Sequence, residues 1–341
     1  MSPLRIAVAL PHLGVYGGIR RFLELGRVWV ARGHRVALLT PRASGQGEAP
    51  WLPFDGHVGD LGELETAAWD AVLCPDPKLL LELEPRGALL VYYAVLEGAP
   101  AMREACRNAD LVLANSRGMV RYVGYLGIQA AEAVGGVNLA FFRPDSPDPR
   151  PLRAHTGAPV QVLVYGRLSR ARKGSRAAVR AVERAARATR VPTELTLFDT
   201  IPPGASEPKL GNVRIPHRWV LGPTQERLRE LYASADIFVS AERRAGWSNT
   251  AAEAMACGAA VVCTRSGTED FAIDGLTAAV SWHWSWALAR KIAPLLRDPE
   301  ARTALAISGR ARIGQFPWER TADRIEAALR ARLARKVSAH A

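Results

Sequence analysis

The fold of this chain is decided by the stretch Ala245-Gly-Trp-Ser-Asn-Thr-Ala-Ala-Glu253-Ala-Met-Ala-Cys-Gly258-Ala-Ala-Val-Val-Cys263. This stretch predicts a turn over residues 246–249 that opens a short helix over residues 250–256, which Gly258 ends. The apolar run that follows predicts a buried strand. Because the first turn of a helix presents unpaired backbone N–H groups and the positive end of its dipole, the stretch predicts a site for an anion.

A second stretch, earlier in the chain, supplies the cations for such a site. Gly166-Arg167-Leu168 follows an apolar run from Val160 to Val164, and Arg172-Lys173-Gly174 comes shortly after it. The apolar run predicts a parallel strand, and open α/β sheets hold their ligands beyond the carboxyl ends of such strands. Arg167 and Lys173 are therefore placed to meet a phosphate, although an ordinary surface ion pair is the alternative.

Together the two stretches resemble the signature of glycosyltransferase family 4, the retaining nucleotide-sugar glycosyltransferases of the GT-B fold. Members of that family carry a strand followed by Gly-Arg-Leu and Lys-Gly, and later two glutamates, separated by seven residues, that lead into Ala-Met-Ala-x-Gly-x-Pro-Val-Val. Further blocks match in the family's order over nearly the whole chain. They are Ile6 to Leu10, Gly17-Gly18, Ala31 to Thr40, Ala109 to Ser116, Gly135 to Asn138, Ala235 to Ser240 and Phe316 to Glu319. Any one block alone is a weak signal, whereas the ordered set is a strong one.

The resemblance implies an α/β protein of the GT-B fold, with two Rossmann-like doubly wound parallel-sheet domains facing a cleft. Strand and helix patterns alternate along the chain, which agrees with parallel sheets covered by helices. We expect an acceptor domain over residues 1–145, a donor domain over residues 146–316, and a closing helix over residues 317–341 that crosses back to the first domain. The proline-rich stretch Arg143 to Pro151 is the expected linker, because prolines are excluded from helix interiors and central strands.

The activity implied by the resemblance is transfer of a sugar from a nucleoside-diphosphate-sugar to an acceptor hydroxyl, with retention of the anomeric configuration. Negative charge builds on the leaving diphosphate, so cations aimed there stabilise the transition state more than the ground state. Arg167 and Lys173 are expected in that role. The sequence holds no Asp-x-Asp pair, with which metal-dependent transferases usually hold their cation. We therefore expect a metal-independent enzyme without a cofactor.

Other donor contacts are expected around the same signature. By the resemblance, Glu253 accepts hydrogen bonds from the ribose hydroxyls, a task that suits the two oxygens of a carboxylate; an ordinary helix glutamate is the alternative. Gly17 and Gly18 open the first helix and either let a ligand approach the backbone or only form a turn. The full set of donor-binding candidates is Gly17, Gly18, Gly166, Leu221, Glu242, Gly246, Trp247, Ser248, Asn249 and Thr250. Leu221 is included because the loop over residues 217–223 is expected to select the base.

One departure from the family pattern affects the sugar site. The first signature glutamate, which contacts the transferred sugar in the family, falls at Ala245 in this chain, and the nearest carboxylate is Glu242. Either Glu242 reaches the sugar, or the contact is made by Trp247, Ser248 or Asn249. The exchange also leaves open a non-catalytic nucleotide-sugar-binding subunit. A related GT-B enzyme, such as a phosphorylase or an epimerase, is a further alternative.

A second departure affects the acceptor side. Many members place a histidine after a first-domain strand, beside the reacting sugar, where this chain has Tyr92 and Tyr93. A tyrosine is a poor base near neutral pH because of its high reference pKa. The leaving phosphate can itself accept the acceptor's proton in a retaining mechanism. The acceptor-side candidates are His12, Tyr92, Tyr93 and Asn115.

Composition and charge limit the class of protein and its partners. The 341 residues are 48% hydrophobic and 23% charged, which is ordinary globular usage and enough for two domains. Residues 1–150 carry 15 Lys and Arg against 16 Asp and Glu, a net charge of −1, and the remaining residues carry 30 against 17, a net charge of +13. A solvated basic surface, attraction of an anionic nucleotide and docking on an anionic membrane all explain this excess. Nucleic acid is not an expected partner, because no recognition motif is present.

The expected setting is the cytoplasm, at most peripheral to the inner membrane face, in bacterial polysaccharide or glycoconjugate biosynthesis. The amino terminus lacks a signal-peptide pattern, and no apolar run approaches the length of a membrane span. Four scattered cysteines lack metal-ligand spacing and are expected to be reduced core residues. The expected partners are a nucleotide-sugar donor and a carbohydrate, lipid-linked or small-molecule acceptor.

Two clusters of large side chains have competing interpretations. One interpretation of Trp282, Trp284 and Trp286 is a surface that stacks on a sugar, and another is a surface at the edge of a membrane. We favour a third, in which they pack against the closing helix. Arg20 and Arg21 on the first helix bind an anionic acceptor or lipid head groups, or, as we favour, are solvated.

Overall fold

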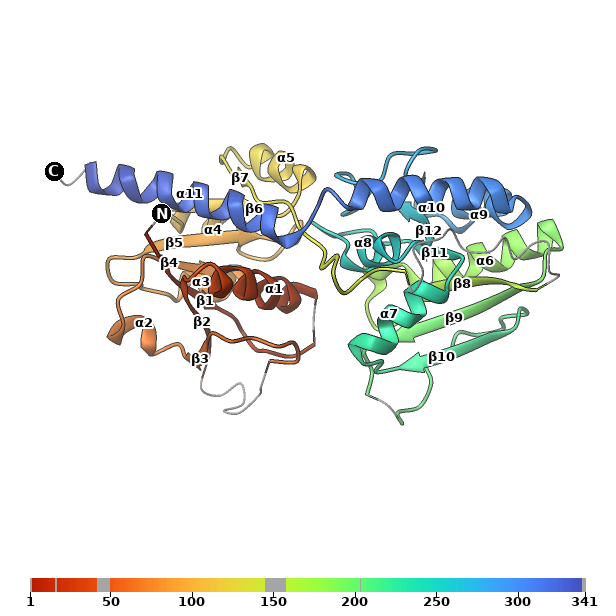
Figure 1. Cartoon of the computed structure of the whole chain (residues 1–341), viewed down its shortest axis with the longest axis horizontal. Coiled ribbons are helices and arrows are strands. Elements are labelled where there is room, and N and C mark those ends of the chain that lie inside the picture. Colours follow the sequence, from red (N-terminus) through yellow and green to blue (C-terminus); the bar gives the residue numbers. More distant parts are fainter. Residues whose placement is uncertain (1, 16, 42–49, 145–157, 203, 339–341) are drawn as a thin grey trace. The chain divides into compact units, whose positions relative to one another are not determined.

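The computed structural model describes residues 2–15, 17–41, 50–144, 158–202 and 204–338. The chain folds into two compact α/β units, one formed by Met1–Gly136 with Phe316–Ala341 and the other by Val137–Gln315 (Figure 1). The boundary between the two units, at Gly136 and Val137, falls earlier in the chain than the boundary expected near residue 145. The reason is that Phe142, which is 2% exposed, already packs in the second unit, with its ring centroid 6.1 Å from that of Tyr232. Most of the predicted linker lies outside the described residues.

The first unit is built on a seven-stranded sheet in the order β3-β2-β1-β4-β5-β6-β7, with all neighbouring strands parallel. Its strands are β1 Arg5–Ala9, β2 Arg35–Thr40, β3 His57–Asp60, β4 Ala71–Cys74, β5 Leu89–Ala94, β6 Leu111–Ala114 and β7 Ala131–Glu132. Its helices are α1 Gly17–Ala31, α2 Glu63–Thr66, α3 Pro77–Leu81, α4 Met102–Asn108, α5 Arg117–Tyr125 and α11 Trp318–Ser338. The strand order reverses direction between β1 and β4, which is the switch point of a doubly wound sheet.

The second unit repeats this plan with a six-stranded parallel sheet in the order β10-β9-β8-β11-β12-β13. Its strands are β8 Val160–Tyr165, β9 Thr193–Asp199, β10 His217–Leu221, β11 Ile237–Ser240, β12 Ala260–Thr264 and β13 Ala279–Ser281. Its helices are the 3₁₀ helix η3 Ala171–Lys173, then α6 Ser175–Thr189, α7 Gln225–Ser234, α8 Asn249–Ala256, α9 Ser285–Arg297 and α10 Pro299–Ile313. Two doubly wound parallel-sheet units confirm the predicted fold class.

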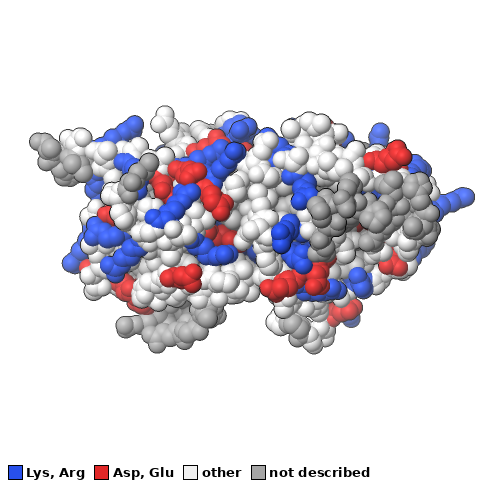
Figure 2. Space-filling model, viewed as in Figure 1, with Lys and Arg blue, Asp and Glu red and all other residues white. Residues whose placement is uncertain are grey.

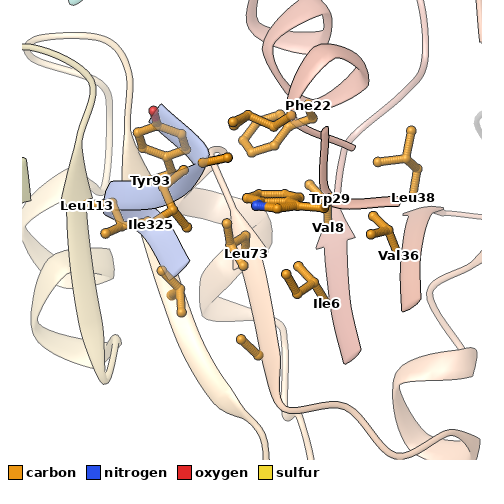
Figure 3. Close-up of a cluster of buried hydrophobic side chains, with 14 of the residues drawn as sticks. Ile6, Val8, Phe22, Trp29, Val36, Leu38, Leu73, Tyr93, Leu113 and Ile325 are labelled. Carbon is orange, nitrogen blue, oxygen red and sulfur yellow. The ribbon is translucent and has the colours of Figure 1, made fainter. Parts of the chain in front are cut away.

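The core of the first unit explains why its central strands are almost entirely apolar. Both faces of the sheet are covered, so inward and outward side chains are alike buried. Figure 3 shows one of these clusters, in which Trp29 of α1 lies over Val8 of β1 and Ile325 of α11 lies near Tyr93 of β5. The closing helix α11 therefore contributes directly to the core of the first unit, as the fold class predicted.

Trp318 anchors the start of α11. Its side chain is 3% exposed, and a Cβ added at Gly136 would lie 2.7 Å from its ring, so the backbone passes close beneath it. One turn later, the hydroxyl of Thr321 donates a hydrogen bond to the Val134 carbonyl at 2.6 Å. Arg32 of α1 forms ion pairs with Glu326 at 2.6 Å and with Asp323 at 2.8 Å. These contacts fix the helix at several points along its length.

Arg20 and Arg21 are buried, so the expectation of solvated arginines was wrong. Their side chains are 7% and 2% exposed, because the face of α1 that carries them turns inward. The Arg21 guanidinium lies 5.0 Å from the ring centroid of Tyr93 and 5.9 Å from that of Trp318, and Arg20 lies 4.9 Å from Trp51. Aromatic faces attract the cations and partly replace their lost hydration.

The cysteines lie in the cores as unreactive thiols. All four are buried, and none forms a disulfide bond. Burial raises the pKa of Cys74 and of Cys263 to about 12, and that of Cys106 to about 11. A thiol that stays protonated near neutral pH is a poor nucleophile. The prediction that the cysteines are core residues is confirmed.

The anchoring role of Trp318 predicts a large stability effect. Trp318→Ala should lower the free energy of unfolding by about 3–5 kcal/mol, because a large buried side chain is replaced by a cavity. Trp284→Ala is the matched control: Trp284 is 55% exposed, and its loss should change the free energy by less than about 0.5 kcal/mol. Denaturant unfolding followed by circular dichroism measures both. Equal effects of the two substitutions would contradict the packing described here.

Candidate functional site

The candidate site lies at the carboxyl ends of β8, β9 and β11 in the second unit. After β8, the chain turns through Gly166 and Arg167 into η3, and Gly174 then starts α6. Gly174 adopts the left-handed conformation with φ of 66°, and a Cβ at this position would lie 2.1 Å from the carbonyl oxygen of Ala241. The backbone N–H of Arg243 also donates to the Arg172 carbonyl at 2.8 Å. The cationic loop is therefore fastened against the segment that follows β11.

Arg167 is held by the end of β9. Its Nη1 lies 3.0 Å from Oδ1 of Asp199, the last residue of that strand, and also donates to the hydroxyl of Thr200. The Asp199 side chain is fully buried, and that of Arg167 is 16% exposed. The same Asp199 oxygen accepts a hydrogen bond from the Thr200 backbone N–H at 2.6 Å. The parallel pairing of β8 with β9 brings this carboxylate to the cation.

Lys173 and Arg172 are held by a second buried carboxylate. Oε1 of Glu242 lies 2.5 Å from Nζ of Lys173 and 3.1 Å from Nη1 of Arg172. The Glu242 side chain is 2% exposed, whereas those of Lys173 and Arg172 are 20% and 39% exposed. Oε2 of Glu242 lies 3.5 Å from the hydroxyl of Ser248. The side chains of Lys173 and Arg172 are thus partly exposed, whereas the Glu242 carboxylate that pairs with them is buried.

Tyr165, the last residue of β8, lies beside Lys173. Lys173 Nζ is 5.6 Å from the centroid of its ring, which stacks on Phe198 at 5.1 Å. Burial raises the pKa of Tyr165, although the nearby Arg167 cation acts in the opposite direction. The phenol is therefore neutral at physiological pH, and Tyr165 contributes an aromatic surface to the site rather than a charge.

The signature helix α8 begins one residue before its predicted start. Ser248 precedes it, and the Ser248 backbone N–H donates to the Gly267 carbonyl at 2.8 Å. Asn249 and Thr250 in the first turn are half-buried, and Gly246 is buried. The Trp247 ring is 6% exposed and packs on Phe271 with centroids 4.9 Å apart. Trp247 is therefore a core residue of this loop.

Glu253 and Ala245 occupy the two signature positions. Glu253 on α8 is 4% exposed, and its Oε2 accepts a hydrogen bond from the buried Tyr232 hydroxyl at 3.1 Å. Ala245 is 7% exposed, and its backbone N–H donates to the Ser266 hydroxyl at 2.8 Å. A Cβ added at Gly267 would lie 2.7 Å from the Ala245 side chain. The donor contacts assigned to Glu253 and its neighbours stay predictions.

The backbone at Leu221 lies beside Asp199 of the site. It ends β10 and pairs in register with Asp199, and the next N–H, that of Gly222, donates to the Asp199 carbonyl at 2.8 Å. The end of β10 therefore flanks the Arg167 pair. Gly166 is needed for a different reason: a Cβ there would lie 2.3 Å from the Trp219 ring.

The first unit carries the acceptor-side candidates, and the structure argues against two of them. Tyr92 and Tyr93 are 1% and 0% exposed, and burial raises the pKa of both hydroxyls. The Tyr93 hydroxyl donates to the Ala133 carbonyl at 2.5 Å. Both residues face the covered sides of the sheet, where apolar helices pack. They serve the core rather than an acceptor.

The remaining first-unit candidates lie at strand and helix ends. Nδ1 of His12, which is half-buried, accepts a hydrogen bond from the Gly14 N–H at 3.1 Å. Asn115 is 1% exposed and donates to the Val95 carbonyl at 3.3 Å. Gly17 and Gly18 are exposed at the start of α1, and a Cβ at Gly18 would meet no atom within 4 Å. Neither intramolecular packing nor a positive φ explains the glycine at position 18.

The tryptophan cluster does not pack as expected. Trp282, Trp284 and Trp286 are 75%, 55% and 54% exposed. The favoured explanation, packing against the closing helix, was wrong, because more than half of each side chain is exposed. Ile273 and Leu276, at 45% and 57% exposure, add apolar surface from the preceding loop.

Sequence reasoning did not identify the carboxylate Asp199 or the role of Arg172. Asp199 ends an apolar run, Leu195 to Phe198, and a charged residue in that position was an available signal. Within the described residues, no cluster of three or more His, Cys, Asp or Glu side chains has the arrangement of a metal site. In the same part of the chain, no helix combines the length and apolar character needed to cross a membrane.

Comparison with known proteins agrees with this geometry. Residues 159–298 match the family Glycosyl transferases group 1. A curated relative, D-inositol 3-phosphate glycosyltransferase of Segniliparus rotundus, is 35% identical over 118 residues, which cover 34% of this chain and 26% of the relative. The matched region thus spans about a quarter of that relative's length.

Solved structures of similar architecture extend the likeness to the whole chain. Sucrose-phosphate synthase from Thermosynechococcus elongatus has a TM-score of 0.71 at 20% identity, covering 99% of this chain and 100% of that one. Anabaena Alr3699/HepE, solved in complex with UDP-glucose, has a TM-score of 0.73 at 16% identity, covering 96% and 100%. WaaG, a glycosyltransferase involved in lipopolysaccharide biosynthesis, has a TM-score of 0.69 at 16% identity, covering 95% and 98%.

The fold is GT-B, and the matches support a glycosyltransferase. The segment that matches the group 1 family contains all three ion pairs of Arg167, Arg172 and Lys173 and the whole of α8. The candidate site therefore lies inside the matched region.

The close approach at Gly174 predicts a strong local requirement for glycine. Gly174→Ala should lower the free energy of unfolding by about 2–5 kcal/mol, through left-handed strain and the clash with Ala241. Gly87→Ala is the control, because Gly87 has φ of 74° but open space around its Cα. Strain alone should cost it about 1–2 kcal/mol. Thermal and denaturant unfolding compare the two, and an equal loss would show that the clash is relieved.

Proposed function

We propose that this chain is a retaining glycosyltransferase of family 4 that moves a sugar from a nucleoside-diphosphate-sugar to an acceptor hydroxyl. The observation that carries the proposal is the meeting of Arg167, Lys173 and Arg172 at one sheet edge in the segment that matches the group 1 family. Each cation keeps an exposed side. Three positive side chains at the carboxyl ends of parallel strands suit a diphosphate.

Arg167 and Lys173 are the proposed catalytic cations. When the bond between the anomeric carbon and the diphosphate breaks, negative charge grows on the leaving oxygen, and fixed cations lower the energy of that state. The backbone N–H groups at Asn249 and Thr250 add the positive end of the α8 dipole. These groups supply the charge that a metal ion provides in other transferases, so we propose metal independence and no cofactor.

The donor is proposed to bind the second unit and the acceptor the first. Glu253 is the proposed ribose ligand, and the loop at Leu221 is the proposed selector of the base. At Gly18, the open space around the Cα leaves room for a ligand beside the first turn of α1. Retention follows from the proposed family membership, with the leaving phosphate accepting the proton of the acceptor hydroxyl.

The proposal predicts binding of one nucleoside diphosphate without metal. Among UDP, GDP, ADP, CDP and dTDP, tested in EDTA, one should stabilise the protein by roughly 2.7 kcal/mol at about a hundred times its dissociation constant. Arg167→Ala and Lys173→Ala should abolish the shift, whereas Arg170→Ala, an exposed arginine on the same loop, should retain it. Thermal unfolding provides the measurement.

Other outcomes separate the alternatives. A shift that appears only with added Mg²⁺ or Mn²⁺ would refute metal independence. Absence of any shift would mean that the phosphate site does not form as proposed. A nucleotide shift without turnover of any sugar donor would favour a non-catalytic subunit, and release of sugar phosphate rather than free nucleotide would favour a phosphorylase.

We also propose that the protein is cytoplasmic and contacts an anionic membrane through Trp282, Trp284 and Trp286. Tryptophan is favoured at the boundary between lipid and water, where its ring is apolar and its N–H is wet. The half of the chain that carries these residues has a net charge of +13, which attracts anionic lipids. On the face seen in Figure 2, basic side chains are interspersed with acidic ones.

The membrane proposal predicts specific loss of lipid binding. The wild type should sediment with vesicles of phosphatidylglycerol and phosphatidylcholine, and the triple variant Trp282→Ala, Trp284→Ala, Trp286→Ala should not. Tyr125→Ala is the control, because Tyr125 is an exposed aromatic of the first unit at 85% exposure. Equal sedimentation of the triple variant and the wild type would refute the role of these tryptophans.

A further inference from the structure

The cations of the candidate phosphate site are paired with carboxylates of the same unit. Arg167 contacts Asp199 at 3.0 Å, and Glu242 contacts Lys173 at 2.5 Å and Arg172 at 3.1 Å. Both carboxylates are buried, with side-chain exposures of 0% and 2%. A buried charge is costly unless it is paired, so each carboxylate strongly restricts the positions that its cations can adopt.

The two carboxylates come from other strands than the cations that they hold. Asp199 belongs to the end of β9 and Glu242 follows β11, whereas the three cations lie on the loop after β8. The backbone of Glu242 is itself held, because its carbonyl accepts a hydrogen bond from the hydroxyl of Thr264, the last residue of β12. A long lysine or arginine side chain loses considerable rotamer freedom when it is ordered. Here that ordering occurs within the folded protein, so a ligand does not have to supply it.

The contacts of Glu242 bear on whether this residue can bind the transferred sugar. Its Oε1 serves two cations, and its Oε2 faces the Ser248 hydroxyl at 3.5 Å. With 2% of its side chain exposed, Glu242 is committed inward. Its distance in sequence from Ala245 is short, but its carboxylate is used for charge pairing.

We propose that Asp199 and Glu242 are positioning residues that hold Arg167, and Lys173 with Arg172, in the geometry that receives the diphosphate, and that Glu242 does not contact the donor sugar. The identity of the anion rests on the proposed function. The pairing itself does not, so the two are tested separately.

The first experiment measures the pairing without any ligand. Lysine acetylation by a water-soluble succinimidyl ester, followed by mass spectrometry, reports how freely each lysine reacts. Glu242→Gln should raise the rate at Lys173 by about fivefold or more, because the amide no longer carries the charge that holds the ammonium group. Asp274→Asn is the matched control: Asp274 pairs with Lys291 at 2.7 Å, so this change should raise the rate at Lys291 and leave Lys173 unchanged. An unchanged Lys173 rate in Glu242→Gln would overturn the proposal, whether or not the protein binds a nucleotide.

The second experiment uses inorganic pyrophosphate, which has neither sugar nor base. Isothermal titration should show that Glu242→Gln and Asp199→Asn each weaken pyrophosphate binding by about tenfold.

Three other results of the pyrophosphate titration would contradict one of the proposals. Loss of the negative charge by itself strengthens attraction of an anion, so tighter pyrophosphate binding in Glu242→Gln would overturn the positioning role. Unchanged pyrophosphate binding with weaker binding of a sugar nucleotide would identify Glu242 as a sugar ligand instead. If the wild type binds neither pyrophosphate nor any nucleoside diphosphate, the proposed function fails, and the labelling experiment still decides the pairing.

Discussion

The parallel pairing of β8 with β9 and β11 is the constraint on which the site depends. In register, Tyr165 pairs with Phe198 and Val164 with Val239, so the three strands end at one edge of the sheet. Each strand delivers its next residues to that edge: the cationic loop after β8, Asp199 at the end of β9, and Glu242 after β11. In an antiparallel sheet, alternate strand ends would lie at opposite edges, and the charges would not meet.

Close backbone packing then turns this edge into a rigid platform. Gly174 allows the loop to touch the Ala241 carbonyl, and Gly166 allows the Trp219 ring to cover the end of β8. The loop therefore has little freedom to carry its cations away from the sheet. This rigidity matters for electrostatic stabilisation, because groups that are fixed in advance do not have to reorganise when charge develops.

The first unit is stabilised by a different mixture of interactions. Its covered sheet places Tyr93 in the core, and Arg21 lies against that ring and against Trp318 of the closing helix. The closing helix thus belongs energetically to the first unit, although it comes last in the chain. In the second unit, by contrast, Trp282, Trp284 and Trp286 remain exposed.

The sequence by itself determined the features that depend on neighbouring residues. An apolar run before Gly166 predicted the end of β8, and an apolar run after Gly258 predicted the start of β12, each within one residue; the start of α8 was also placed within one residue. The residue types at Arg167 and Lys173 also pointed to an anion. Tertiary structure alone decided the partners of those cations, which lie 32 residues away at Asp199 and 69 residues away at Glu242. It likewise decided that Arg21 and Tyr93 are buried and that the tryptophans are exposed. The physical reason is that periodicity, capping and turn chemistry are local, whereas charge pairing and burial depend on which strand ends and helix faces the complete fold brings together.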